Sequence, residues 1–159
     1  MTSSDTTTFS RPSDLELVMA RVFDAPRELV FQAYTDPVHI PHWWGQRGST
    51  TIVDAMDARP GGLWRYIQRD ADGNEYAFNG EYREVVPPER LVYTFEFEGM
   101  PGQVVVDSLT FEERDGKTTI TSTSLFASVA DLDGMLESGM ESGANESWDR
   151  LAELLETLR

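Results

Sequence analysis

The chain has 159 residues, 40% of them hydrophobic, and its 28 Asp and Glu against 13 Lys and Arg give a formal net charge of −15. A chain of this length can bury one core of ordinary size, so we expect a single domain. The negative charge would repel a phosphate backbone or an anionic membrane surface, which argues against nucleic acid and membranes as partners. A solvated acidic surface that maintains solubility explains this charge more simply than a specific cationic partner.

Missing sequence signals narrow the class further. The chain contains no cysteine, which excludes disulfides, thiolate metal sites and thiol nucleophiles and fits the cytoplasmic location that we predict. Residues 1–14 have neither the basic start nor the apolar run of a signal peptide. We expect them to form a disordered tail before one domain over residues 15–159. No stretch approaches the roughly 18 apolar residues that a membrane span needs.

The first predicted elements are a strand and a helix. Residues 15–23 (LELVMARVF) alternate in polarity and contain β-branched side chains, which predicts a strand. Residues 24–35 (DAPRELVFQAYT) follow with apolar side chains on one helical stripe. Asp24 is the expected N-cap of this helix, and Pro26 falls in its first turn. Two prolines in DPVHIPHWWGQRG, residues 36–48, then allow only a short helical turn.

The middle of the chain reads as an antiparallel meander. Turn signals recur at hairpin spacing in RPGG, DADGN, VPPER, GMPGQ and ERDGK. The segments between them are rich in β-branched and aromatic residues, which favours strands. The six predicted strands cover residues 49–56, 63–69, 75–85, 91–98, 104–112 and 118–126.

An amphipathic helical segment ends the chain and needs the sheet as its packing partner. It begins with a capping pattern at Ser128 and contains Gly139 and Gly143. Either the segment breaks there, leaving residues 128–136 as a separate lid-like turn, or the glycines sit where a ligand or the sheet approaches closely. The helical stripe after them consists of Trp148, Leu151, Leu154, Leu155 and Leu158.

This element order resembles the helix-grip, or START-like (SRPBCC), fold. The stretches RVFDAPRELVFQAYTDPVHIPHWWG, ARPGGLWRY, DGNEYAFNGEYREVVPPERLVYTF and GMESGANESWDRLAELL resemble the C-terminal-domain family named for the activator of heat-shock protein 90 ATPase. That family belongs to the superfamily of polyketide cyclases, lipid-transfer domains and the birch-pollen allergen. The resemblance implies an α+β fold, β-α-α-β6-α, with a curved antiparallel sheet around a long C-terminal helix. It transfers fold better than function.

The histidines and the tryptophans of residues 36–48 suggest different roles. His39 and His42 have helical spacing, but the chain has no cysteine or third histidine to complete a site, so we predict no metal. Trp43 and Trp44 belong to the family pattern. We expect at least one of them to be buried against the sheet, where the pair walls off one end of the space beneath the terminal helix.

Strand parity indicates which side chains face that space, because alternate residues of a strand share one face. We assign the aromatic residues of three strands to this concave face and their neighbours Glu81, Arg83, Thr94 and Glu96 to solvent. Such rings could simply fill a core, but the implied fold has an internal cavity. The predicted ligand-binding residues are Trp44, Trp64, Tyr66, Phe78, Tyr82, Tyr93, Phe95, Phe97, Met140 and Gly143.

The implied function is binding of a small apolar or amphipathic molecule, without a cofactor. One alternative is a cyclase- or hydratase-type enzyme that acts on a hydrophobic substrate. Its candidate proton-transfer groups are Tyr66, Tyr82, Glu84, Tyr93 and Asp107, but none forms a recognisable dyad with a histidine, so we assign no catalytic residue. A second alternative, a co-chaperone, rests on the family name alone. An apolar patch left by the short helices would support a homodimer.

Overall fold

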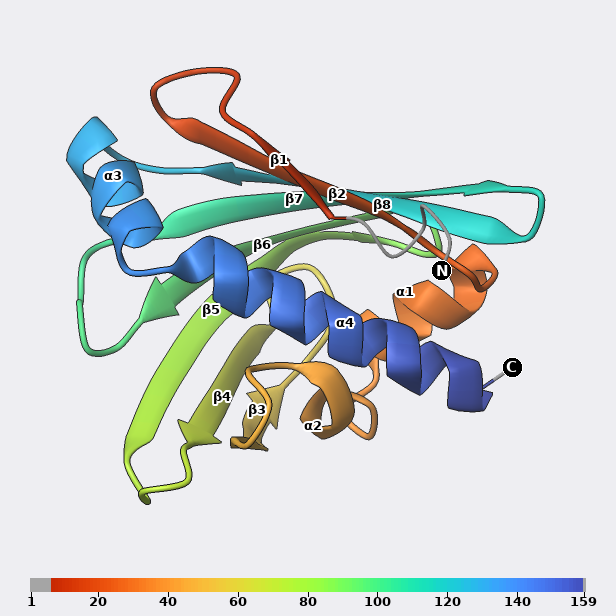
Figure 1. Ribbon diagram of the computed structural model, residues 1–159, viewed down its shortest axis with the longest axis horizontal. Coiled ribbons are helices and arrows are strands. Elements are labelled where there is room, and N and C mark those ends of the chain that lie inside the picture. The colour runs from red at the N-terminus through yellow and green to blue at the C-terminus, as the bar shows by residue number, and fades with distance from the viewer. Residues whose placement is uncertain (1–6, 159) are drawn as a thin grey trace.

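The computed structural model describes residues 7–158 and confirms the expected α+β element order (Figure 1). The elements are β1 (Thr8–Ser10), β2 (Glu16–Phe23), α1 (Arg27–Thr35), α2 (Ile40–Trp43), β3 (Thr50–Met56), β4 (Leu63–Arg69), β5 (Glu75–Val86), β6 (Arg90–Phe97), β7 (Val105–Arg114), β8 (Lys117–Leu125), α3 (Val129–Glu137) and α4 (Met140–Leu158). All six strands of the predicted meander are present within a residue or two of their expected bounds, as the alternation of side chains required.

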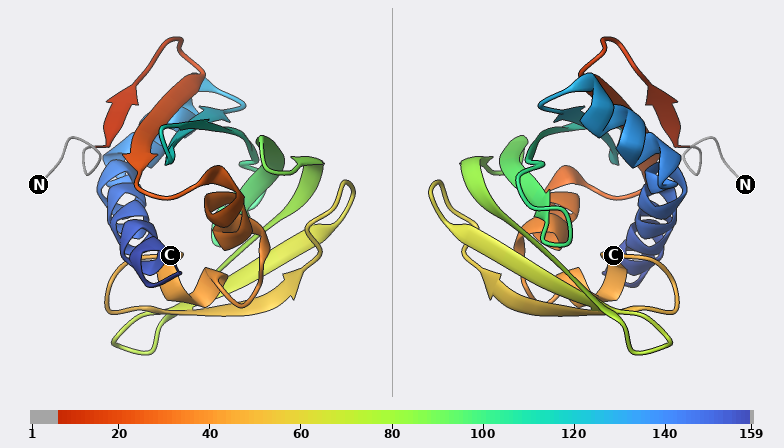
Figure 2. Two further views of the ribbon diagram at one scale, coloured as in Figure 1. Left: turned by 90° about the vertical axis from the view of Figure 1, so that its right-hand side faces the viewer. Right: turned by 90° about the vertical axis from the view of Figure 1, so that its left-hand side faces the viewer.

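The strands form one eight-stranded sheet in the order β1-β2-β8-β7-β6-β5-β4-β3. Every neighbouring pair is antiparallel, and β2, although early in the sequence, pairs with the last strand of the meander. Figure 2 shows the sheet bent around α4, which crosses its concave side. Register shifts between Val53 and Ala55 in β3 and between Tyr82 and Glu84 in β5 are the kind of irregularity that bends strands. The fold is therefore the helix grip that the resemblance implied.

Two expectations for the N-terminal segment are wrong. Residues 8–10, placed in a disordered tail, form β1 and pair with β2, because the edge of β2 would otherwise leave its backbone groups unpaired. Residues 1–6 of that tail lie outside the described residues. Asp24 is not the N-cap of α1, since Pro26 holds that position without a side-chain cap. Instead, Glu113 in β7 accepts a hydrogen bond of 2.8 Å from the backbone N–H of Arg27.

The main core lies between the sheet and α1, α2 and the second half of α4. The buried face of α4 consists of Trp148, Leu151 and Leu155, as its spacing predicted. Each of these side chains contributes about 1.5–3 kcal/mol by leaving water. The Phe23 ring meets Trp148 edge to face at 5.4 Å between centroids, and Phe31 of α1 meets Phe111 of β7 at 5.2 Å. These contacts hold α4 against β2 and α1 against β7.

The helical segment at the end of the chain breaks where one alternative expected it to. Gly139 separates α3 from α4 with a φ of 86°, a conformation that favours glycine. The Ser128 side chain caps α3 by accepting a hydrogen bond of 3.1 Å from the Asp131 N–H. Leu132 then anchors α3 in a second small core with Leu17, Val105 and Phe126. No helix within residues 7–158 is both long and apolar enough to cross a membrane.

Candidate ligand-binding cavity

The two adjacent tryptophans have different surroundings because α2 ends between them. Trp43 is 2% exposed, and its indole N–H donates to the Ala33 carbonyl at 2.8 Å, while its ring lies 4.6 Å from Tyr34. Trp44, the C-cap of α2, is only half-buried and turns its ring toward β4 and β5. At least one of the pair is therefore buried, as expected, and its hydrogen bond and ring contact are with α1. Trp43 belongs to the core around α1 and only borders the cavity, whereas the Trp44 ring contacts the aromatic wall of β4 and β5.

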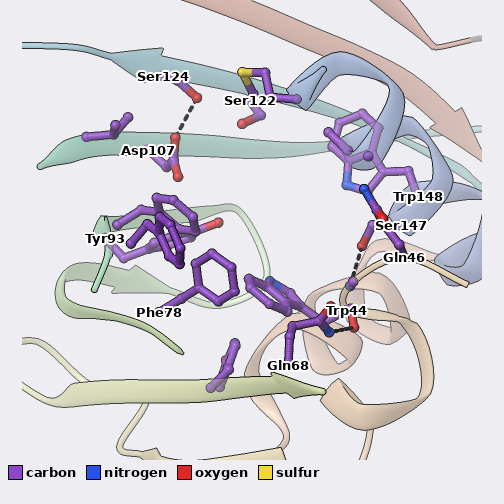
Figure 3. A pocket seen from close by; sticks show the side chains of 18 of the residues that line it. Trp44, Gln46, Gln68, Phe78, Tyr93, Asp107, Ser122, Ser124, Ser147 and Trp148 are labelled. Atoms are coloured by element: carbon purple, nitrogen blue, oxygen red, sulfur yellow. Dashed lines mark hydrogen bonds between the residues drawn. The ribbon is translucent and has the colours of Figure 1, made fainter. Parts of the chain in front are cut away.

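A polar network anchors the loop that carries Trp44. The buried Gln68 amide donates to the Trp44 carbonyl at 3.2 Å and also to Thr51 Oγ1. Ser49 Oγ donates to Gln68 Oε1 at 3.0 Å. From the other side, Ser147 Oγ of α4 donates to the Trp43 carbonyl at 3.1 Å. The loop after α2 is therefore tied to both β4 and α4, and the position of the Trp44 ring follows from both ties (Figure 3).

A cavity of about 740 Å³ lies between the concave face of the sheet and the first half of α4. All ten residues predicted to bind a ligand line it. Strand parity brings the aromatic residues of β4, β5 and β6 together, and α4 adds Met140 and Gly143 at the other wall. A Cβ atom on Gly143 would lie 2.9 Å from the Gln46 amide nitrogen, so the close neighbour of this glycine is the loop after α2, whereas the second alternative had expected a ligand or the sheet.

The aromatic rings of the cavity contact one another in edge-to-face, tilted and stacked arrangements. Trp44 lies 5.1 Å from Tyr66 and 5.2 Å from Phe78, and Phe78 stacks on Phe95 at 5.6 Å. The Trp64 indole N–H is satisfied by the Thr94 carbonyl at 3.2 Å. These ring geometries are favourable, and the Trp64 indole N–H already has a hydrogen-bond acceptor. The wall is therefore preorganised without a ligand.

Asp107 of β7 is one of two carboxylates that line this cavity, with Asp70 as the other. The register pairs it with Tyr93 of β6 on one side and Ser124 of β8 on the other. Ser124 Oγ donates to Asp107 Oδ1 at 2.5 Å, and Figure 3 shows the carboxylate directed into the cavity on the side of Tyr93. Burial raises the pKa of Asp107 to about 6, and the Ser124 hydrogen bond opposes that rise. Asp107, a candidate proton-transfer group of the sequence analysis, therefore lies in the cavity wall.

The tyrosines around Asp107 stay protonated at physiological pH. Burial raises the pKa of Tyr82 to about 12 and, helped by the Asp107 charge, raises that of Tyr93 well above its usual value. Burial also raises the pKa of Tyr66 and of Tyr34, whose oxygen accepts a 2.7 Å hydrogen bond from the Trp148 indole. These hydroxyl groups can therefore donate hydrogen bonds to a ligand but cannot serve as bases near neutral pH.

Two sequence expectations about side-chain direction are wrong. Glu84, a candidate proton-transfer group, is exposed and forms a surface ion pair with Arg90 at 3.1 Å, because the register shift after Tyr82 turns it outward. Thr94 was assigned to solvent, but it is 8% exposed and its Oγ1 accepts a 2.9 Å hydrogen bond from the Glu81 N–H. His39 lies just before α2, at its N-cap, and His42 lies on α2. Within residues 7–158, no three His, Asp or Glu side chains gather to hold a metal ion.

Sequence reasoning missed most of the polar lining. Gln68 follows Trp64 and Tyr66 at the same strand parity, so alternation alone would have placed it on the concave face. Ser122 and Ser124 have the same parity as the buried Ile120 in β8 and were open to the same inference. Tyr34 and Ser147 come from helices. Nothing in their local sequence distinguishes a cavity wall from a core contact.

Known structures resemble this one over nearly the whole chain. A crystallised protein of Mycobacterium smegmatis is 29% identical with a TM-score of 0.85, covering 94% of this chain and 97% of that one. A solution structure from Staphylococcus epidermidis is 28% identical with a TM-score of 0.81, covering 96% and 95%. The AHSA1 protein from Silicibacter pomeroyi, at 21% identity, a TM-score of 0.76 and coverage of 91% and 99%, shows the fold alone.

A search of curated proteins found no match to this chain. The sequence does match the family described as "Activator of Hsp90 ATPase homolog 1-like protein" over residues 24–156. That span begins just before α1 and ends within α4, so it includes every residue predicted to line the cavity. The chain belongs to the activator of Hsp90 ATPase homolog 1-like family, within the START-like superfamily.

Proposed function

We propose that this protein binds a small apolar or amphipathic molecule in the cavity between the sheet and α4. The observation that carries the proposal is a partly filled interior. Phe78, Tyr93 and Phe95 point inward yet remain only half-buried, whereas core rings such as Trp43 are covered. The cavity volume of about 740 Å³ lies in the range of small-molecule sites, about 300–1,000 Å³.

Mass spectrometry of the intact native protein isolated from its source cells tests this proposal, because it weighs any retained molecule directly. A titration with an environment-sensitive dye and with uncharged aliphatic probes then measures affinity. The expected result is one saturable site for each probe. If no molecule is retained and no probe binds, the rings are merely core and the proposal is wrong.

Two variants of α4 test whether the probes bind in this cavity. Ala144 lines the cavity, whereas Ser142 is exposed on the same helix. Ala144→Phe places a ring inside the cavity and should weaken probe binding about tenfold or more, because added volume competes with the ligand. Ser142→Phe adds the same ring outside and should leave affinity unchanged. Equal effects of the two variants would place the binding site elsewhere.

A second candidate, proton-transfer catalysis on a hydrophobic substrate, is favoured by Asp107. A carboxyl group whose pKa lies near 6 inside an apolar cavity is suited to exchange a proton at neutral pH. Asp107→Asn should then abolish turnover of a cavity-bound substrate while leaving its binding intact. Loss of both together would favour a binding role. The co-chaperone alternative stays an untested prediction that rests on the family description.

A further inference from the structure

We propose that the physiological ligand of the cavity is an amphipathic amine, whose protonated nitrogen pairs with Asp107 while its apolar part lies among the aromatic rings. This inference rests on the proposed binding function and specifies the chemistry of its ligand. It also excludes a class, since a fatty acid or another anionic amphiphile should bind poorly.

The charges that line the cavity have one sign. Within residues 7–158, the lining includes the carboxylates of Asp70 and Asp107 and no Lys, Arg or His side chain. A carboxylate ligand would therefore meet like charge and no cationic partner in a medium of low dielectric constant, which is costly. A cation meets the reverse situation, because its charge compensates one that the fold already buries.

The two lining carboxylates are not equivalent. Asp70 lies in the turn between β4 and β5, where its oxygens accept hydrogen bonds from the Asp72 and Asn74 backbone N–H groups, both at 2.9 Å, and from the Asn74 side chain at 3.2 Å. Burial opposes ionisation of Asp70, but these hydrogen bonds from Asn74 and Asp72 lower its pKa. Asp70 is thus occupied in stabilising a turn at the rim.

Asp107 by contrast has a single protein partner. Among the described residues, its side chain accepts one hydrogen bond, from Ser124 Oγ to Oδ1. A carboxylate has room for about four such bonds, so Oδ2 keeps its acceptor capacity toward the cavity. A half-buried carboxylate with only one donor is unfavourable by itself. A ligand ammonium group would supply the missing donors through charge-assisted hydrogen bonds.

The surroundings of Asp107 suit a cation as well. Tyr93 lies directly across the strand pair from Asp107, and its ring continues through Trp64, 6.0 Å away, to Phe95 at a further 6.1 Å. Aromatic faces attract ammonium groups, most strongly where water is excluded. The same rings accept an aliphatic or aromatic body. One carboxylate beside an aromatic wall is therefore complementary to a molecule with a cationic head and an apolar tail.

The pairing should depend on pH in a defined direction. The groups that face Asp107 are Ser124 of β8, Tyr93 of β6 and, at longer range, Tyr34 of α1. Both tyrosines remain neutral because burial raises their pKa values, so Asp107 is the group that titrates. Its pKa of about 6 means that it is protonated at pH 5 and ionised at pH 7.5. Amine affinity should therefore rise with pH through about 6 and then level off.

Isothermal titration calorimetry with decylamine, decanol and decanoate, each below its aggregation concentration, tests the proposal on the intact protein. The three probes share one chain and differ in the head group. At pH 7.5 decylamine should bind about ten- to a hundredfold more tightly than decanol, as expected for a charge-assisted pair, and decanoate should bind most weakly. Repeating the series at 0.5 M salt controls for attraction by the net charge of −15, which salt screens.

Asp107→Asn is the matched variant, because it keeps the shape of the side chain and its acceptor toward Ser124. It should remove the preference for decylamine over decanol and its pH dependence while leaving decanol affinity within about threefold. Asp70→Asn removes the same charge from the rim and should leave the preference in place. Circular dichroism spectra identical to the wild type establish that each variant is folded.

The outcomes separate this inference from the function beneath it. If wild-type protein binds decanoate or decanol as tightly as decylamine, the amine assignment is wrong while ligand binding stands. The assignment is equally wrong if Asp107→Asn and Asp70→Asn reduce the preference alike, because a diffuse negative field then explains it. If none of the three probes binds, the proposed function itself fails.

Discussion

The two ends of the space beneath α4 differ although they share one helix and one sheet. At the C-terminal end, Trp148, Leu151 and Leu155 meet α1 and leave a filled core. At the N-terminal end, α4 offers Gly143 and Ala144 to a wall of rings, and a cavity remains. The cavity is therefore produced by small residues on α4 and by the position of α1. The sheet contributes large side chains at both ends.

Polar contacts between residues far apart in the sequence nevertheless hold the hollow end in place. Arg150 of α4 donates to the carbonyl of Gly45 at 3.0 Å, and the Gly45 N–H donates to Ser147 Oγ at 3.2 Å. Arg47 also pairs with Glu153 of α4. Because the loop after α2 is tied to α4 at several points, the helix cannot settle onto the rings and close the cavity. Four sets of variants test how differently the two ends are packed.

The largest effect is expected from the adjacent tryptophans. Trp43→Ala removes a covered ring from the filled end and should lower the free energy of unfolding by about 3–5 kcal/mol. Trp44→Ala removes a half-buried ring from the cavity wall and should cost far less, while weakening probe binding. Urea denaturation of both variants measures the difference. Equal losses would mean that the two ends are packed alike.

Asp107→Asn should raise the free energy of unfolding, because an ionised carboxylate in the cavity destabilises the folded state. The pKa of Asp107 is raised from 3.8 to about 6, so the unfolded chain loses its proton first as the pH rises between these values. Stability is therefore lost over that window and stays lost above it, by up to roughly 3 kcal/mol. Urea denaturation should show that gain for the variant at pH 7.5 and a gain that shrinks toward zero below pH 4. A pH-independent difference would contradict it.

Phe95→Ala should enlarge the cavity at a moderate cost in stability. The ring is only half-buried, so we expect a loss of about 2 kcal/mol, less than for a covered ring. The new space is apolar and should admit larger apolar probes than the wild type accepts. Thermal melting and titration with probes of increasing size check the two effects. A loss of stability without any change in the range of bound probes would place Phe95 in the core.

The smallest effects should come from the two glycines near the start of α4, and they should have opposite signs. Gly139→Ala forces a side chain into a positive φ and should destabilise the protein by about 1 kcal/mol. Gly143→Ala lies inside the helix and should gain up to about 1 kcal/mol, provided that the Gln46 side chain moves aside. Differential scanning calorimetry resolves the two. A loss at both positions would show that Gln46 cannot yield.

The aromatic lining could be predicted from the sequence because strand parity is local. Trp64, Tyr66, Phe78 and Phe95 all face inward as the alternation required. The same rule failed at Thr94, whose hydroxyl satisfies a neighbouring strand, and at Glu84, which follows a register shift. Irregularities of this kind depend on the partner strand, so no pattern within one strand reveals them.

Most of the polar lining could not be predicted with the same security. Asp107 was recognised only as a candidate proton-transfer group, and its isolation from any cation within the described cavity became visible once β6, β7 and β8 were paired. Tyr34 looked like one apolar member of a helical stripe, yet its oxygen accepts a hydrogen bond from an indole far along the chain. Such roles arise from contacts between distant segments.

The order of the elements from β2 onward, the face of each regular strand and the amphipathic side of α4 could be read from the sequence. These features depend on side-chain period and on turn residues within a few positions. The break at Gly139 was one of two alternatives that the sequence left open, and the structure selected it. Only the tertiary structure decided that the interior is filled at one end and hollow at the other. The distance between α4 and the sheet is set by contacts such as Ser147 with Trp43, 104 residues apart, and the volume left between them is a property of that distance.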